Sequence, residues 1–224
     1  QLDIAVGRLT AETPQEASNI VAKIRRYATD PQAFGNWRTE LVLLADYKSG
    51  ETYHMTDCER HQANKIRPNA PCMVSEKIYL DNYPKQSTPS GARYPGAERA
   101  LELALNSGQL IMNYAGHGGP VKLSDAGIVD VPLVNSLRNG SKLPLWITAT
   151  CTFGRYDDPP VKTAAEQLLS NPDGGAIGLI TSVREVFASR NFRFNQLIYD
   201  YALSLNPATN QPYTLGEINM LAKN

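Results

Sequence analysis

The sequence predicts a three-layer α/β/α domain built around a mostly parallel central sheet. Short apolar runs bounded by turn residues, which are typical of buried strands, alternate along the chain with amphipathic stretches typical of helices. This alternation favours parallel strands joined by covering helices. Two of the apolar runs also end in small residues that carry one reactive side chain each, and open parallel sheets bind ligands just beyond the carboxyl ends of their strands.

The first part of the chain is expected to hold two strands and two helices. Residues 3–8 are predicted to form a short strand. Residues 13–16 (TPQE) combine an N-cap threonine, a proline at the first helical position and a glutamate at the third, which predicts a helix that ends near residue 30. Residues 39–45 (TELVLLA) are an apolar run and so a buried strand, followed by a polar loop at 47–52 and a weakly patterned helix at 53–66. The apolar face of the first helix consists of Ala17, Ile20, Val21, Ile24 and Tyr27.

The middle of the chain is expected to contain two further strands. Residues 75–80 (SEKIYL) alternate in part and predict a strand. Residues 81–90 are rich in Pro, Asn, Ser and Thr, which predicts an exposed loop. Apolar residues at helical spacing predict a helix over 95–106, and the apolar run 110–115 predicts the next strand.

The last part of the chain continues the same alternation. A short helix is expected over 131–137, before an apolar run at 143–150 that predicts a buried strand. A short helix at 163–170 then leads through a glycine-rich turn to another buried strand at 176–180. Two more helices are expected, at 193–205 and at 214–222.

Composition supports one sizeable domain and excludes two classes of protein. The 224 residues, 42% of them apolar, suffice for one sizeable α/β domain over 1–224 or for two small ones, and any internal boundary is expected at 81–92. The formal net charge is zero and no basic stripe is present, so nucleic-acid binding is not expected. No apolar run reaches the roughly 18 residues of a membrane helix. Because the chain opens on a strand-like run and ends within a helical pattern, we expect a fragment of a longer polypeptide.

The three cysteines differ in their surroundings. An odd number leaves at least one thiol free, and three cysteines in this length do not make a disulfide scaffold. Cys58 lies in the weak helix and Cys72 in a proline-flanked turn, so both are predicted to be structural, with a disulfide between them left open. Cys151 instead follows a buried strand, which is where a reactive thiol can face a ligand.

Three chemically active side chains follow three predicted strands: Asp46, His117 and Cys151. If these strands are parallel, the side chains share one edge of the sheet. An imidazolium beside the cysteine lowers the pKa of the thiol and populates the nucleophilic thiolate near neutral pH. A carboxylate would hold one tautomer of the histidine ring. The sequence therefore predicts a catalytic site made of Cys151, His117 and Asp46.

Backbone groups and nearby side chains complete the predicted site. Gly118 and Gly119 let a substrate backbone approach closely, because neither has a Cβ atom. The backbone N–H groups of Gly118 and Cys151 are expected to donate to a tetrahedral oxyanion. The residues expected to contact substrate are Glu51, Gly119, Thr181 and Ser182.

Simpler explanations exist for most of these residues. A cysteine after an apolar run is usually a buried core thiol, and a histidine among glycines is usually a turn residue. Glu51 also suits an exposed loop. Asp157 and Asp158 form either a solvated loop or a contact for calcium or a substrate amine, so a structural calcium ion is left open. His54 and His61 share a helix face, but no Cys or carboxylate stands at zinc-motif spacing, so no metal site is expected.

At these motifs the sequence resembles the gingipain family of caspase-like cysteine peptidases. The segments that carry the resemblance are DIAVGRL at 3–9, WR at 37–38 before LVLLAD, NYAGHG at 113–118, LP at 143–144 and TATC at 148–151. Two further segments are similar to the PorU-type sortases of the type IX secretion system in particular. They are CTFGRYDDP at 151–159 and NPDGGAIG at 171–178.

The resemblance implies a caspase-like (caspase–haemoglobinase) fold and a cysteine endopeptidase or transpeptidase that needs no cofactor. Cys151 would form the acyl-enzyme and His117 would be its base. Asp46 falls where the gingipains place a glutamate that orients the histidine, and Glu51 lies near their acidic specificity residue. The resemblance also implies protein substrates and a location at the cell surface, at the outer membrane or outside the cell.

Within the family, the PorU-type branch implies a more specific role. Such a sortase removes the C-terminal sorting domain of secreted cargo, works with other secretion-system components and passes the acyl group to an amine-bearing lipopolysaccharide. A freely secreted gingipain-like protease would use the same residues for hydrolysis only, and the sequence does not separate these two functions. A catalytically silent secretion or binding module is disfavoured, because both Cys151 and His117 are present.

Overall fold

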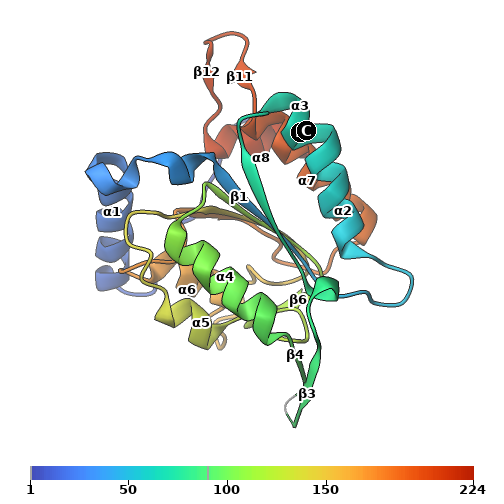
Figure 1. The fold of residues 1–224 in the computed structure, drawn as a ribbon. Coiled ribbons are helices and arrows are strands. Elements are labelled where there is room, and N and C mark those ends of the chain that lie inside the picture. The colour runs from blue at the N-terminus through green and yellow to red at the C-terminus, as the bar shows by residue number, and fades with distance from the viewer. Residues whose placement is uncertain (1, 90) are drawn as a thin grey trace.

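A five-stranded parallel sheet forms the centre of the computed structural model, which describes residues 2–89 and 91–224. The strand order is β10–β9–β5–β1–β2, and each neighbouring pair is parallel. Figure 1 shows the sheet between two groups of helices, which confirms the predicted three-layer fold. The strands are β1 (Glu40–Ala45), β2 (Val74–Tyr79), β5 (Ile111–Ala115), β9 (Leu145–Ala149) and β10 (Gly178–Ile180).

Helices cover both faces of the sheet. On one face lie α4 (Pro95–Ser107), α5 (Val131–Ser136) and α6 (Ala164–Ser170). On the other lie α2 (His54–His61), α7 (Ala188–Ala202) and α8 (Leu215–Lys223). α1 (Pro14–Thr29) packs beside α6, and a π-helical turn at Gln62–Ile66 links α2 to the short α3 (Arg67–Asn69). Among the described residues, no helix has both the length and the apolar character needed to cross a bilayer.

Shorter elements complete the chain. Short 3₁₀ turns lie at Pro31–Ala33, Asn36–Thr39 and Leu80–Asn82. Two small hairpins are formed by β3 (Gln86–Thr88) with β4 (Gly91–Arg93), and by β11 (Leu205–Asn206) with β12 (Gln211–Pro212). A small antiparallel sheet contains β6 (Gly118–Gly119), β7 (Lys122–Leu123) and β8 (Val129–Asp130).

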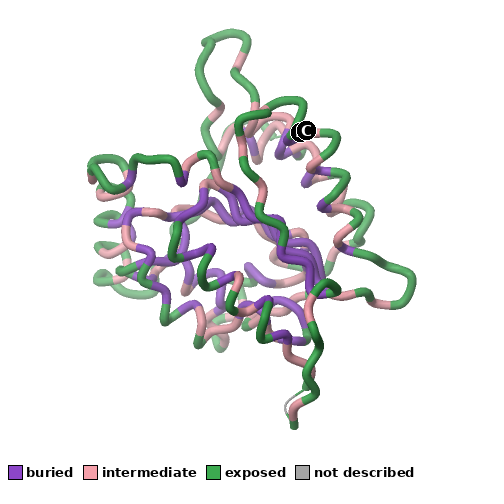
Figure 2. Tube along the Cα trace, in the orientation of Figure 1, coloured by how far each residue is buried: buried purple, intermediate pink, exposed green. Residues whose placement is uncertain are grey.

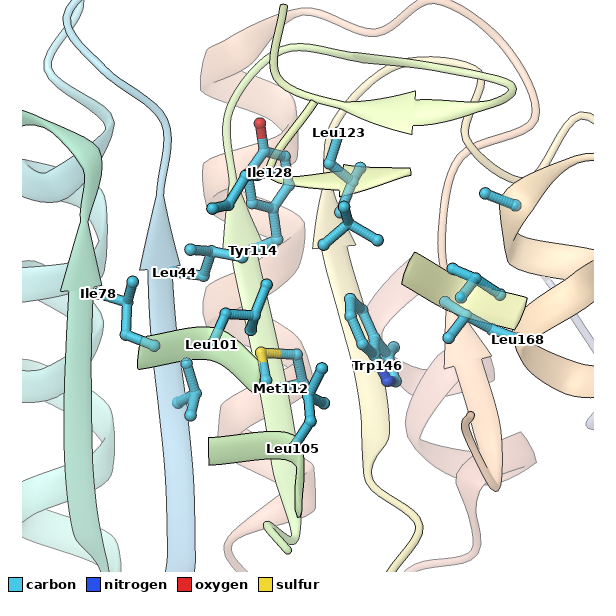
Figure 3. Packing of buried hydrophobic residues seen from close by; sticks show 14 of the residues in the cluster. Leu44, Ile78, Leu101, Leu105, Met112, Tyr114, Leu123, Ile128, Trp146 and Leu168 are labelled. Carbon is cyan, nitrogen blue, oxygen red and sulfur yellow. The ribbon is translucent and has the colours of Figure 1, made fainter. Parts of the chain in front are cut away.

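The alternation of side chains along β1 explains why the sheet has a hydrophobic core on each face. Successive side chains of a strand point to opposite faces, so a strand buried on both faces needs an uninterrupted apolar run. Leu41 and Leu43 face the α2 and α7 side, whereas Leu44 lies with Leu101 of α4 on the opposite side (Figure 3). Figure 2 shows the strands as the most continuously buried part of the trace. Each fully buried leucine contributes about 2 kcal/mol.

The predicted strand at residues 3–8 is wrong. These residues belong to no strand, and the side chains of Ile4 and Val6 are 71% and 66% exposed. A strand needs a neighbour that satisfies its backbone groups. Here the segment is held instead by hydrogen bonds between Leu2 and Asn224, and further along by the guanidinium of Arg8, which lies 4.5 Å from the ring centroid of Tyr156.

The predicted apolar face of the first helix is wrong in part, although the helix itself begins and ends as expected. Ile20 is buried as predicted, but Val21 and Ile24 are exposed and Lys23 is buried in their place. The reason is that α1 packs against α6 and the loop after it, where the ammonium group of Lys23 finds carbonyl acceptors. Periodicity alone does not indicate which side of a helix meets its neighbour.

Two further differences concern local boundaries. The predicted loop at 81–90 contains β3 and its hairpin with β4, which projects from the domain (Figure 1). Leu80 and Tyr94, on either side of this hairpin, pack in the same hydrophobic cluster, and the domain boundary at 81–92 stays a prediction. The helix expected at 193–205 begins earlier, at Ala188, because the polar side chains of its first turns obscure the apolar pattern.

His61 is a buried histidine that should make the stability of the domain depend on pH. Its ring stacks on Phe192 with the centroids 4.9 Å apart and also contacts Tyr199. Burial lowers the pKa of His61 from 6.5 to about 4. The unfolded chain therefore takes up this proton at a higher pH than the folded chain. The resulting stabilisation is fully present above pH 6.5 and is lost as the pH falls toward 4, by about 3 kcal/mol for such a shift.

The variant His61→Phe tests this prediction because it keeps a flat ring that cannot be protonated. We expect the free energy of unfolding to fall less steeply in the variant than in the native protein between pH 6.5 and 4. Urea titrations at several pH values would measure both proteins. The same pH dependence in the two proteins would contradict the prediction, because carboxylate protonation affects both equally.

Candidate active site

The register of the sheet brings the predicted nucleophile and base to the same edge. β5 and β9 are neighbours, with Ala115 opposite Ala149. His117 and Cys151 each lie two residues beyond this pair. The backbone N–H of Gly116 donates to the carbonyl oxygen of Ala149 at 3.3 Å, so the chains still run side by side past the end of the strands. Adjacent strands lie about 4.8 Å apart. The structure thus places Cys151 and His117 on neighbouring strand ends.

The two glycines after His117 differ in the space around them. A Cβ atom at Gly118 would lie 2.5 Å from Oγ1 of Thr150, the residue before Cys151, so only glycine fits there. A Cβ at Gly119 would meet no atom within 4 Å. The His117 segment therefore touches the Cys151 segment through Gly118, and its backbone is open at Gly119, where the sequence predicts substrate contact.

Asp46 fixes the backbone of the segment that carries His117. Its buried carboxylate accepts from the N–H of His117 at 3.1 Å and from the N–H of Tyr47 at 2.9 Å. The hydroxyl of Tyr114 donates to the carbonyl oxygen of His117 at 2.6 Å. Burial, and then the neighbouring Asp46, raise the pKa of Tyr114 well above its ordinary value, so this hydroxyl remains a donor. The role of Asp46 in holding the ring tautomer stays a prediction.

Hydrogen bonds tie the loop after Cys151 to the segment after β10. Cys151 is half-buried, and its Sγ lies 3.8 Å from the carbonyl oxygen of Val186. Thr152 has a φ of 46°, the left-handed region that threonine rarely adopts, and the loop bonds hold it there. Two backbone bonds join the segments, from Thr152 N–H to Arg184 O (3.3 Å) and from Gly154 N–H to Ser182 O (3.0 Å).

The backbone N–H of Cys151 is available for the predicted oxyanion contact. Among the described residues it has no hydrogen-bond acceptor. Gly118, the second predicted donor, lies beside Thr150, one residue away along the neighbouring chain. Both predicted donors therefore lie at the same edge of the sheet, and their role as an oxyanion hole stays a prediction.

The other predicted substrate contacts lie at different distances from this centre. Glu51 is exposed in the turn of the loop at 47–52. Thr181 accepts a hydrogen bond from the hydroxyl of Thr148 at 2.6 Å, and with Ser182 it lines a cavity of about 20 Å³. A space of this size holds one water molecule but no side chain. The roles of these residues in specificity stay predictions.

The remaining cysteines are distinct from Cys151. Cys58 is fully buried, its Sγ lies 3.9 Å from the carbonyl oxygen of Leu44, and burial strongly raises the pKa of its thiol. Cys72 is exposed. Both are free thiols, so the disulfide that the sequence left open is not formed.

The acidic residues after Cys151 form ion pairs. Asp157 pairs with Arg184, and Asp158 lies 3.3 Å from the guanidinium of Arg155. Within the part of the chain that the structure describes, no group of three or more His, Cys, Asp or Glu side chains is placed to hold a metal ion. A structural calcium ion stays a prediction.

One residue at the site was missed by the sequence analysis. The ring of His54 packs edge-to-face on the ring of His117, with the centroids 5.3 Å apart and the planes at 85°. The sequence pattern points to His54 only as a possible metal ligand. The available signal was its place in the chain, since it starts the helix that follows the short loop after Asp46.

The chain is similar to known proteins in its sequence pattern and in its fold. A family model described as Peptidase family C25 matches residues 1–224. No curated protein matches the sequence. The fold is similar to the complex of Porphyromonas gingivalis RgpB pro- and mature domains (17% identity, TM-score 0.78, 98% of this chain and 50% of that chain). It is also similar to the Arg-specific cysteine proteinase gingipain R (18% identity, TM-score 0.76, 97% of this chain and 48% of that chain). The chain thus spans about half the length of these structures.

Proposed function

The chain belongs to peptidase family C25, and from this premise we propose that it cleaves peptide bonds with Cys151 as nucleophile and His117 as general base and acid. The observation that carries the proposal is the register of β5 and β9, which brings these two residues to neighbouring strand ends. The similarity of the fold to the gingipain structures supports it. Proteins are therefore the substrates that we propose.

The proposed reaction has two stages. The thiolate of Cys151 attacks the scissile carbonyl carbon, and the backbone N–H groups of Cys151 and Gly118 donate to the oxyanion that forms. The imidazolium of His117 then gives its proton to the leaving amine, and a thioester remains on Cys151. In the second stage His117 removes a proton from water or from an amine, which attacks the thioester and releases the thiolate.

We further propose that the acceptor in the physiological reaction is an amine, as in the PorU-type sortases. The segments 151–159 and 171–178 support this proposal through their similarity to that branch. The enzyme would then remove C-terminal sorting domains from secreted cargo and pass the acyl group to an amine-bearing lipopolysaccharide. Such a reaction takes place at the cell surface or outer membrane, in contact with other secretion-system components.

The experiment that tests the proposal maps new peptide termini by mass spectrometry. The protein is incubated with denatured proteins, with and without prior treatment by iodoacetamide, and with or without added glycinamide. We expect new termini in the untreated sample. In the treated sample iodoacetamide should label Cys151 before the other cysteines, and cleavage should be lost in parallel with that labelling. With glycinamide present, part of the new C-termini should carry the amide.

Each outcome distinguishes the functions. Cleavage that persists after complete alkylation of Cys151 would rule out the cysteine peptidase. If the new C-termini are free carboxylates at every concentration of glycinamide, the protein is a peptidase that only hydrolyses. The absence of any cleavage, together with unselective labelling of Cys151 and the exposed Cys72, would favour a silent binding module.

A further inference from the structure

The residues next to His117 in the chain provide no side-chain contact that could hold its imidazole in one orientation. His117 stands between Gly116 and the pair Gly118–Gly119, so its neighbours in the chain offer no side chains against the ring. Asp46 and Tyr114 hold its backbone N–H and carbonyl groups, which fixes the chain but leaves two side-chain torsions free. A general base must have its ring nitrogen aimed at the proton that it takes, so a further contact is needed.

His54 supplies such a contact from a different element. As the first residue of α2, it lies over the strand ends and meets the His117 ring edge-to-face at 5.3 Å between centroids. Its side chain is 8% exposed, so α2 fixes its position. Its Nε2 is buried and has no hydrogen-bond partner among the described residues. A buried polar atom without a partner destabilises the fold. The contact that the structure shows for the ring of His54 is its packing on the ring of His117.

Burial of His54 favours a neutral ring. Burial lowers the pKa of His54, and His117 lowers it further, while the carboxylates of Asp46 and Asp81 oppose both effects. A neutral ring is what the contact requires, because a charged His54 would repel the imidazolium that His117 forms in the reaction. A neutral aromatic ring at this angle instead packs favourably against it.

We propose that His54 is a positioning residue, whose ring holds the imidazole of His117 in the orientation from which it exchanges a proton with Cys151. The proposal rests on the peptidase function described above, because it assigns His54 an effect on that proton transfer. In this role His54 need touch neither the sulfur nor the substrate. It acts through the ring of His117 alone.

Two apolar variants separate ring packing from simple space filling. His54→Phe keeps a flat, neutral ring, and His54→Leu keeps an apolar side chain without one. The matched control is His61→Phe, a change at a second buried histidine of the same helix that contacts Phe192 and Tyr199. All variants carry Cys72→Ser, so that Cys151 is the accessible thiol, and thermal unfolding checks that each protein is folded.

The readouts are the alkylation rate of Cys151 by iodoacetamide from pH 5 to 9 and the kinetics of peptide cleavage. We expect His54→Leu to lower the alkylation rate at pH 6.5 by about tenfold or more, and to lower kcat similarly while KM stays within about twofold. His54→Phe should recover both to within about threefold of the native values, and His61→Phe should match the native protein.

Native rates in His54→Leu would overturn the proposal, as would a His54→Phe variant no better than His54→Leu. The variant His117→Ala separates this outcome from failure of the proposed function. If His117→Ala leaves the alkylation profile of Cys151 unchanged, the thiol is not activated by His117 and the peptidase mechanism itself is wrong. If His117→Ala abolishes the low-pH reactivity and His54→Leu does not, only the role of His54 fails.

Discussion

Replacing Cys151 by alanine is expected to lower the rate of peptide cleavage by about 10⁴- to 10⁶-fold, the loss seen when a catalytic nucleophile is removed. The sulfur has no substitute at the end of β9, because the neighbouring Thr150 is buried and an unactivated hydroxyl is a far weaker nucleophile than a thiolate. His117→Ala should cost nearly as much, and the double variant little more. Two residues that act on the same proton do not contribute independently.

The kinetics of a fluorogenic peptide identified by the terminus mapping would measure these losses. Cys72→Ala is the matched control, because this thiol is exposed and lies just before β2, at the opposite end of the parallel strands from Cys151. Cys151 is only half-buried, so its removal should leave thermal unfolding nearly unchanged. Cleavage by Cys151→Ala at even a hundredth of the native rate would show that another group is the nucleophile.

Replacing Lys23 by alanine is expected to lower the free energy of unfolding by about 3–5 kcal/mol, the range for removing one partner of a buried charged contact. Lys23 is 1% exposed, and its ammonium group donates to the carbonyl oxygens of Leu168, Asn171 and Gly174 at 3.0–3.1 Å. These carbonyls belong to the end of α6 and the loop before β10. The variant would leave them buried with fewer donors, and would also open a cavity where the aliphatic stem packs.

The measurement is a urea titration at pH 6. Burial lowers the pKa of Lys23 to about 7, so at pH 6 the side chain is charged in the folded and unfolded chain alike and proton uptake does not enter the comparison. Arg25→Ala is the control, because Arg25 is exposed on the same helix and its loss should change the stability by no more than about 0.5 kcal/mol. A loss below about 1 kcal/mol for Lys23→Ala would contradict the prediction.

The sequence alone was sufficient for the parts of the fold that depend on local apolar pattern. β1, β5 and β9 each lie within two residues of their predicted bounds, because a strand buried on both faces must be apolar throughout. The same pattern ends abruptly at Asp46, and shortly before His117 and Cys151, which is why these residues could be assigned to one edge of the sheet. The parallel pairing of these strands could then be predicted from the alternation of strands with helices.

What the sequence did not predict depends on contacts between distant segments. Lys23 is buried because three carbonyl groups of another element meet it, and nothing near Lys23 in the chain indicates them. Ile4 and Val6 alternate as in a strand, but a strand also needs a partner. His54 lies against His117 because a turn in the loop at 47–52 returns the chain to the strand ends. In each case the neighbour, rather than the local pattern, decides the outcome.

The two backbone bonds between the Cys151 loop and the segment after β10 make these stretches a single unit for local opening. The amide protons of Thr152 and Gly154 can exchange with deuterium only when Arg184 and Ser182 move away. Their exchange rates therefore report on the segment 182–184, which lies beside the Cys151 loop and carries no reactive group. An inhibitor that binds to the segment 182–184 would slow deuterium uptake at Thr152 and Gly154 without contacting the sulfur of Cys151.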